Sequence, residues 1–112
     1  MTLPTPCIPF SEFQKLELRV AEIVSAHNHP NADKLVLLKV RIGDREKQIV
    51  AGIRNHYPPE TLAGKKIVVI NNLEAAVIRG ETSEGMLLAA SDETMLTLVV
   101  PERDIPSGAR VK

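Results

Sequence analysis

Residues 80–87, GETSEGML, contain two glycines five positions apart, which resembles the spacing in a phosphate-binding loop. Such a loop also needs a lysine for the terminal phosphates and a serine or threonine hydroxyl for Mg²⁺, directly after the second glycine. Met86 and Leu87 occupy those two positions, while Glu81 and Glu84 would repel phosphate. The segment is therefore not a nucleotide loop. We expect its two glutamates to face water in a glycine-bounded turn.

Two histidines and one cysteine are further candidates for chemistry. His27 and His29 lie two positions apart with Asp33 nearby, a spacing that could hold a metal ion on one face of a strand. Polar residues at a strand end, before a turn, explain the same pattern more simply. Cys7 is the only cysteine, and it lies among prolines, where the geometry of a nucleophile is poorly fixed. The sequence therefore predicts no catalytic residues, no metal site and no cofactor.

Composition indicates an ordinary globular domain. The chain has 112 residues, of which 44% are apolar and 25% charged, enough for a core of its own. The sequence contains no signal peptide and no apolar run long enough to span a bilayer. A single cysteine allows no internal disulfide, which fits a reducing compartment. We expect one cytoplasmic domain over residues 1–112, outside the membrane, and the start at Met1 favours a free-standing protein.

The charged residues are unevenly distributed along a chain whose net charge is zero. Residues 34–66 carry eight basic and three acidic side chains, a net charge of +5, whereas the segments before and after are acidic. A basic segment in a neutral chain suggests an anionic partner that binds locally. A solvated sheet face explains the same distribution nearly as well.

The elements that must position these residues are strands. In residues 34–42, KLVLLKVRI, the even positions are apolar and the odd positions change from leucine to basic residues, so one face is core. Gly43 and Asp44 then suit a tight hairpin that leads into residues 45–51. Within residues 16–27 the apolar positions change parity at Ile23, which predicts a bulge or bend in a long first strand.

Further strands complete a small barrel. Pro59 and Gly64 bound a short helix, and buried strands are expected over residues 65–71 and 84–91, with another over 95–100. Five strands with a helix between the third and fourth is the order of an OB-fold. The predicted fold is all-β, a five-stranded OB-fold barrel over residues 10–91 with a C-terminal β extension over residues 92–112.

Aromatic residues are scarce, which limits how a nucleic acid could bind. Single-strand binders on OB-fold barrels stack bases on aromatic side chains. Phe10, Phe13 and Tyr57 are the only aromatic residues, and none lies on a predicted barrel strand. If RNA is the ligand, we expect contacts to phosphates, sugar edges and overall shape instead.

Three segments together resemble the tRNA-binding domain family, which includes the C-terminal domain of methionyl-tRNA synthetases and small stand-alone dimeric tRNA-binding proteins. They are residues 16–35, 50–73 and 79–91, and the resemblance extends from about Phe10 to the end of the chain. It implies that the S-x-G-M signature forms a turn at the mouth of the barrel, where the family contacts tRNA. Together with the basic second strand, the resemblance predicts these RNA-binding residues: Lys34, Lys39, Arg41, Arg54, Asn72, Arg79, Ser83 and Met86.

One loop departs from the family pattern. Residues 74–78, EAAVI, contain no basic residue, whereas this loop is usually rich in lysine, arginine and proline in the family. Fewer phosphate contacts mean weaker, less salt-dependent binding. We therefore expect this loop to limit the affinity for tRNA.

Two functions from different classes remain open. The first is a structure-specific tRNA-binding module, either free-standing or appended to methionyl-tRNA synthetase. The second is a protein-interaction module, because a secretion-associated chaperone that binds unfolded polypeptides resembles the same family. The basic segment and the intact S-x-G-M signature favour the first, and the apolar Leu35 and Leu37 leave room for the second.

The C-terminal extension predicts a homodimer. Its strand is apolar on both faces, but a strand added outside a small barrel covers only one of them, and an exposed apolar patch usually marks an interface. Free-standing members of the resembling family pair through this region. The predicted interface residues are Met95, Leu96, Leu98, Val99 and Val100. The tail could instead fold back so that both faces are covered within one chain.

Overall fold

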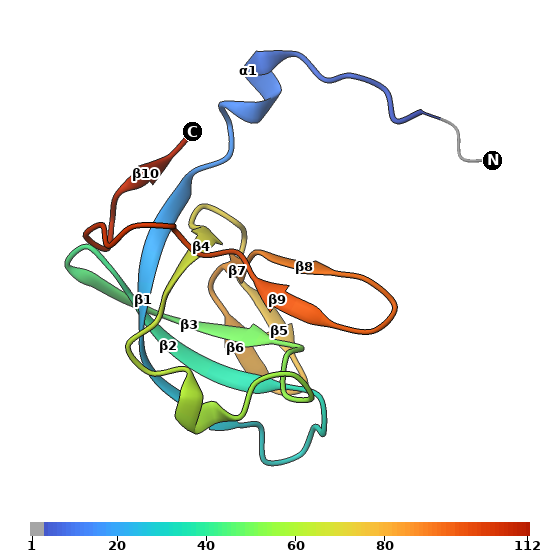
Figure 1. Cartoon of the computed structure of the whole chain (residues 1–112), viewed down its shortest axis with the longest axis vertical. Helices are drawn as coiled ribbons and strands as arrows, with labels where there is room; N and C mark the ends of the chain where they lie inside the picture. The colour runs from blue at the N-terminus through green and yellow to red at the C-terminus, as the bar shows by residue number, and fades with distance from the viewer. Residues whose placement is uncertain (1–3) are drawn as a thin grey trace.

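The computed structural model describes residues 4–112, and it is built almost entirely of strands around one strongly curled sheet (Figure 1). The main sheet has the order β3-β2-β1-β4-β7, with β10 added to β1, and two short two-stranded ribbons, β5–β6 and β8–β9, accompany it. The elements in chain order are α1 (Phe10–Phe13), β1 (Leu18–Asn28), β2 (Val36–Ile42), β3 (Arg45–Ala51), the 3₁₀ helix η1 (Pro59–Thr61), β4 (Lys66–Ile70), β5 (Ala76–Ile78), β6 (Glu81–Ser83), β7 (Met86–Leu87), β8 (Ala89–Ser91), β9 (Leu96–Leu98) and β10 (Arg110–Val111).

The β2–β3 hairpin follows directly from the sequence pattern. The even positions of β2 are all buried, while Lys39 and Arg41 are exposed on its outer face. Ile42 pairs with Arg45, which leaves Gly43 and Asp44 as the two-residue turn. Gly43 has φ +64°, the left-handed conformation that such turns require. The predicted hairpin is confirmed.

Strand β1 turns a corner between its two neighbours. Residues 18–22 pair with β4 and residues 22–28 pair with β2, and the register with β2 shifts between Ile23 and Ser25. The shift is the bulge that the change of parity at Ile23 predicts, and it leaves Ile23 fully buried. The bulge lets one strand belong to both halves of the curl.

The core lies inside the curl of the main sheet, and the segment that contains η1 covers one end of it. Its largest fully buried side chains include Leu38, Ile49, Leu62 and Ile67, and burying each stabilises the fold by roughly 1.5–3 kcal/mol. The short helix predicted between the third and fourth strands is confirmed as η1, and Leu62, which follows it directly, belongs to the core. No helix in residues 4–112 has the length and apolar character needed to cross a membrane.

The strand expected over residues 84–91 is divided into two strands with different partners. Residues Met86–Leu87 form β7 and pair with β4, whereas Ala89–Ser91 form β8 and pair with β9. Leu88 lies between them, and its N–H donates to Val68 O over 3.0 Å. The expectation of a single buried strand is therefore corrected, because β8 leaves the barrel wall and is exposed.

Side chains close the barrel where the two ends of the sheet meet. Ser83 Oγ accepts a hydrogen bond from Val50 N at 3.0 Å and donates one to Gly85 O. Glu84 makes two bonds with Gln48: its N–H donates to Gln48 O, and its Oε1 accepts from Gln48 N at 3.0 Å. Glu84 is exposed, as expected for a residue of this turn, but it also has a structural role. It joins β3 to the segment that precedes β7.

The C-terminal extension covers part of the barrel and then returns to its first strand. Leu98 is only 6% exposed and Leu96 packs against the core, so these two predicted interface residues are covered within the chain. Tyr57 fixes β9 there, because its hydroxyl accepts from Leu98 N at 3.1 Å. Met95, Val99 and Val100 remain exposed. Beyond them, β10 pairs with the start of β1.

The N-terminal arm stands away from this body (Figure 1). Helix α1 has no buried residue, and Phe10 is 69% exposed. Phe10 and Phe13 stack on each other with their ring centroids 6.2 Å apart. The arm therefore presents apolar side chains to solvent.

Candidate nucleic-acid interface

A groove lies between the β1–β2 loop and the tip of the β5–β6 hairpin. Its volume is about 430 Å³. We call it the loop groove, and it is lined by Ala32, Asp33, Lys34, Leu35, Ile78 and Arg79. Two of these residues, Lys34 and Arg79, are among the predicted RNA-binding residues. The groove combines apolar walls with two cations and one carboxylate.

His29 joins the two sides of the groove. It is 3% exposed, and its Nε2 lies 2.9 Å from Arg79 O. Its Nδ1 accepts a hydrogen bond from Asn31 N at 2.9 Å. Since Nδ1 is an acceptor, the proton sits on Nε2 and is donated to Arg79 O. The sequence marks His29 as a polar residue near a turn or as a possible metal ligand, and among the described residues no group of three or more potential ligands gathers that could hold a metal ion. Its role in holding two loops together depends on contacts that no local pattern reveals.

The hairpin tip places Arg79 against the β1–β2 loop. Ile78 pairs with Glu81, so Arg79 and Gly80 form a two-residue turn. Both have positive φ, +51° and +86°, as a hairpin turn of this type requires. The Arg79 guanidinium donates to Asn31 O at 3.0 Å. The guanidinium end of the flexible Arg79 side chain is therefore fixed beside the groove.

Arg54 makes two hydrogen bonds to the same loop. Its guanidinium donates to Ala32 O and its backbone N–H to Lys34 O, each over 3.3 Å. The ion pairs among residues 4–112 involve the cations Lys15, Arg19, Arg41 and Lys66. The structure thus gathers Lys34, Arg54 and Arg79 around one loop without an ion-pair partner in the described part of the chain.

The two predicted basic residues on β2 differ from each other. Arg41 lies opposite Glu22 in the register with β1 and forms an ion pair with it at 3.0 Å. The pair partly neutralises Arg41 before any ligand arrives. Lys39 is exposed between Ser25 and Gln48, with no acid directly opposite on either neighbouring strand. Lys39 is therefore the freer cation of the two.

Ser83 and Asn72 are occupied by structural hydrogen bonds. Ser83 is 4% exposed in the barrel seam described above. The Asn72 amide accepts from Glu17 N at 2.8 Å and donates to Lys15 O at 2.7 Å, which fixes the chain just before β1. Their placement favours a supporting role over direct contact with RNA. Asn72 is exposed but makes both of these bonds, and Met86 is exposed as well.

Gly85 permits the close packing of the S-x-G-M turn. A Cβ at this position would lie 2.9 Å from Ile70 O, closer than real side chains come to a backbone oxygen. Only glycine therefore allows the turn to pass so close to the backbone of β4.

A polar cluster beside Asn72 holds the start of β1 as well. Asn71 donates its side-chain amide to Glu17, and Arg19 forms an ion pair with the same carboxylate at 3.3 Å. The hydrogen bond from Asn71, and next that from Arg19, lowers the pKa of Glu17 below its usual value. Lys47 Nζ donates to Asn71 O at 2.8 Å. These groups tie β1, β3 and β4 together rather than face the loop groove.

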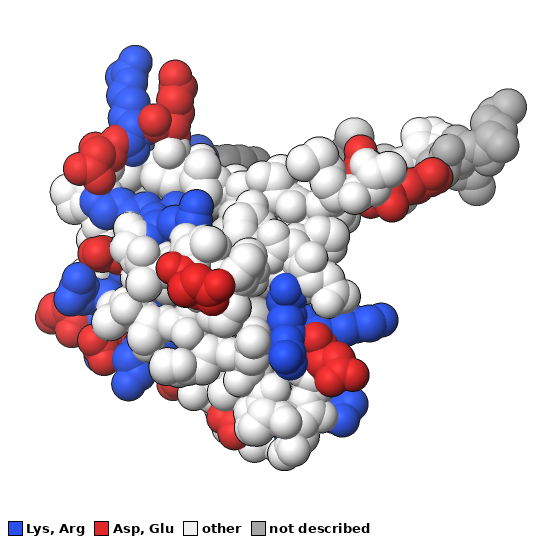
Figure 2. Space-filling view, turned by 60° about the horizontal axis from the view of Figure 1, so that its bottom comes forward, with Lys and Arg blue, Asp and Glu red and all other residues white. Residues whose placement is uncertain are grey.

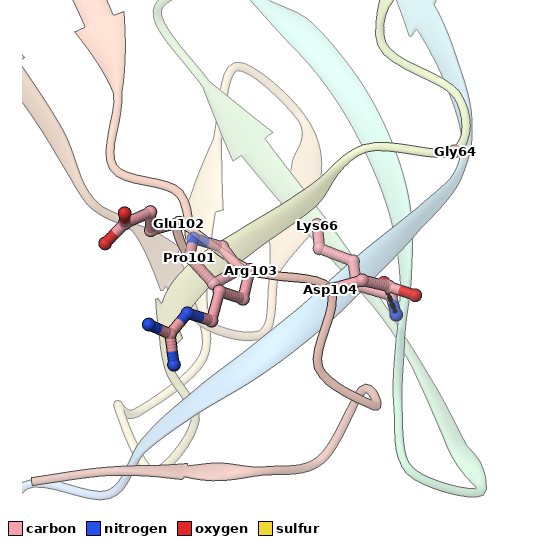
Figure 3. A pocket seen from close by; sticks show the side chains of 6 residues that line it. All are labelled: Gly64, Lys66, Pro101, Glu102, Arg103 and Asp104. Atoms are coloured by element: carbon pink, nitrogen blue, oxygen red, sulfur yellow. Dashed lines mark hydrogen bonds and ion pairs between the residues drawn. The ribbon is translucent and has the colours of Figure 1, made fainter.

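A second hollow, of about 230 Å³, lies beside β4 (Figure 3). Lys66 and Asp104 form an ion pair at 2.7 Å there, and Glu102 and Arg103 point away from that pair. Its two basic and two acidic side chains balance, so it offers no net charge to an anionic ligand. On the face that Figure 2 shows, too, basic and acidic side chains are interspersed and no continuous basic field appears.

Comparison with protein families gives a match over most of the chain. Residues 18–110 match a family model described as "Putative tRNA binding domain". Two relatives are methionine–tRNA ligases: the protein of Thermococcus kodakarensis is 46% identical over 105 residues, and that of Methanococcus aeolicus is 48% identical over 104. These matches cover 94% and 93% of this chain but only 14% and 15% of the relatives.

Solved structures of the same shape include proteins described in two ways. A methionyl-tRNA synthetase-related protein from Pyrococcus horikoshii has a TM-score of 0.90 at 34% identity, over 96% of this chain and all of that one. The chaperone CsaA of Bacillus anthracis has a TM-score of 0.87 at 28% identity, again over 96% and 100%. One fold thus appears under both a synthetase-related and a chaperone description.

Proposed function

The chain belongs to the tRNA-binding domain family, and from this membership we propose that it holds tRNA at the loop groove and the outer face of β2. The observation that carries the proposal is the gathering of Lys34, Arg54 and Arg79 around the β1–β2 loop, free of ion pairs in the described residues. Phosphate contacts by such residues supply most of the affinity of nucleic-acid binding that does not depend on sequence.

The mode of binding follows from what surrounds the groove. Among its lining residues none is aromatic, since Phe10 and Phe13 belong to the arm and Tyr57 packs against the core. The groove therefore lacks the aromatic side chains on which several successive bases of an unpaired strand would stack. Backbone phosphates and the shape of a folded RNA remain as the recognised features. We propose structure-specific recognition of tRNA on that ground.

In this proposal the chain is a non-catalytic binding module of the cytoplasm. The relatives it matches are methionine–tRNA ligases, of which it spans about one seventh. It would therefore act as the appended domain of such an enzyme or beside it as a free-standing partner. In either setting the module raises the local concentration of tRNA without taking part in the chemistry.

A charge reversal tests the proposal. Lys34→Glu should weaken binding of bulk tRNA, measured by filter binding at fixed salt, by about tenfold or more, because a favourable phosphate contact becomes a repulsive one. Arg103→Glu is the matched control, since it makes the same charge change at an exposed residue of the second hollow. Equal affinity of both variants and the unaltered chain would refute the loop groove as the tRNA site.

We also propose a homodimer formed through exposed apolar residues. Met95, Val99 and Val100 on the extension are uncovered, and so is Phe10 on the arm. Exposed apolar patches mark interfaces, and a two-fold dimer is the commonest closed assembly. Leu96 and Leu98 then contribute indirectly, by fixing β9 against the core.

A protein-interaction module is the second candidate function. It is favoured by the apolar walls that Leu35 and Ile78 give the loop groove, and by the likeness to a structure described as a chaperone. Competition separates the two functions. An unfolded polypeptide that displaces bulk tRNA at comparable concentration would support this candidate, whereas tRNA binding that is indifferent to the polypeptide supports the first.

A further inference from the structure

We propose that the loop groove binds one unpaired guanine nucleotide of the RNA. The inference rests on the proposed function and adds to it a base-specific contact. Its elements are the apolar walls of the groove, the planar group of Arg79 and the carboxylate of Asp33. Each matches one part of a nucleotide.

The groove has the size and lining that a single nucleotide needs. Its volume of about 430 Å³ lies within the usual range for small-molecule sites, roughly 300–1,000 Å³. Ala32 is buried, and Leu35 and Ile78 are partly buried, so the groove offers apolar surface to the face of a base. Lys34 stands at the same groove and can contact the phosphate of that nucleotide. Two cations against one acid make the groove positive overall, which favours RNA over a neutral apolar peptide.

Arg79 can replace the missing aromatic residue. Bases of single-stranded RNA stack on guanidinium planes as well as on aromatic rings. The Arg79 side chain is held by its bond to Asn31 O, and its backbone is held by the hairpin turn and by His29. A guanidinium fixed in this way loses little freedom when a base stacks on it.

Asp33 determines which base is preferred. An ionised carboxylate only accepts hydrogen bonds, and its two oxygens can accept two at once. Guanine presents two adjacent donors, N1–H and the N2 amino group, on its Watson–Crick edge. Adenine and cytosine place an acceptor beside a single amino group there, and uracil places its one donor between two carbonyl oxygens. A carboxylate is therefore best matched by guanine.

Short oligoribonucleotides test this preference separately from tRNA binding. The probes are three heptamers of uridine whose central residue is guanosine, inosine or adenosine, titrated by fluorescence anisotropy, with bulk tRNA titrated alongside. We expect the guanosine probe to bind about tenfold more tightly than the adenosine probe. Inosine lacks the N2 amino group and should fall between them. Asp33→Asn should remove the preference, whereas Asp44→Asn, the same change in the β2–β3 turn, should keep it.

The outcomes distinguish this inference from the function on which it rests. If tRNA binds but the three probes bind equally or not at all, the guanine site is refuted and the proposed function stands. If neither tRNA nor the probes bind, the proposed function fails, and the inference fails with it. Binding of the probes that an apolar peptide displaces at comparable concentration would identify the groove as a peptide site and also refute the inference.

Discussion

At the scale of single residues, His29 connects the two loops that form the groove. Its buried ring donates to Arg79 O and accepts from Asn31 N, so each ring nitrogen makes a different hydrogen bond. An asparagine can replace the Nδ1 acceptor but cannot reach Arg79, whereas a glutamine amide has the length to reach it. The two substitutions therefore distinguish the hydrogen bond that joins the two loops from the one within the local turn.

We predict that His29→Asn weakens tRNA binding by roughly three- to tenfold, because one hydrogen bond that positions the hairpin is lost. His29→Gln should retain most of the affinity. Filter binding on protein shown to be folded by its melting curve provides the measurement. If the hydrogen bond from His29 to Arg79 only stabilises the fold, His29→Asn would have a lower melting temperature, but the folded variant would bind tRNA with unchanged affinity. That result would contradict the prediction.

Ser83 illustrates how a signature residue can act without touching the ligand. Ser83→Ala should leave the Val50 N–H without its acceptor in a buried seam, which costs about 1–3 kcal/mol of unfolding free energy. Urea denaturation measures the change. Thr82→Ala is the control, since Thr82 is exposed and gives only its carbonyl to Gln48. Equal stability of the two variants would contradict a structural role for Ser83.

At the scale of elements, the β5–β6 ribbon carries the loop that lacks basic residues. Glu74, Ala76 and Val77 are exposed, with Val77 at 73%, so lysine at each position should not disturb the core. The ribbon leads directly to Ile78 and Arg79 at the groove. New cations there would stand where RNA is proposed to lie.

We predict that replacing these three residues with lysine tightens tRNA binding and steepens its dependence on salt. Each added phosphate contact should change the slope of log K against log salt by roughly 0.7–0.9, because counterions are released. Titrations at several salt concentrations measure the slope. The same slope in the variant and the unaltered chain would show that the ribbon does not reach the phosphates.

The elements also show what the sequence could predict. The apolar even positions of residues 36–42 and the change of parity at Ile23 depend only on near neighbours, so the hairpin and the bulge can be predicted from the sequence. The ion pair of Arg41 with Glu22 depends on a register that the bulge itself displaces. The hydrogen bonds from Val50 to Ser83 and between Asn72 and residues 15 and 17 join positions more than thirty residues apart. Such contacts leave no local pattern.

At the scale of the whole molecule, the C-terminal extension carries the surface through which we propose that two chains pair. One face of β9 packs on the core and Tyr57 holds it there, while Met95, Val99 and Val100 face outward. A dimer would place two loop grooves in one assembly. Two moderate sites can give strong binding if both reach the same RNA.

Light scattering should give a mass near twice the 12.3 kDa of one chain. Val100→Glu should shift the mass toward the monomer, because a charge in an apolar interface is left desolvated and unpaired. Val77→Glu places the same change on an exposed residue of the β5–β6 ribbon and should leave the mass unaltered. A mass of one chain for the unaltered protein, unchanged on concentrating, would exclude the dimer.

The most direct test of the account maps where tRNA touches the chain. Backbone amide shifts, recorded by nuclear magnetic resonance during titration with bulk tRNA, report the contact residue by residue. Binding at the loop groove and the outer face of β2 predicts the largest changes in residues 29–41 and 76–83, with small ones in residues 89–105. Changes confined to the β8–β9 ribbon or to the N-terminal arm, with the groove residues unaffected, would contradict the central claim.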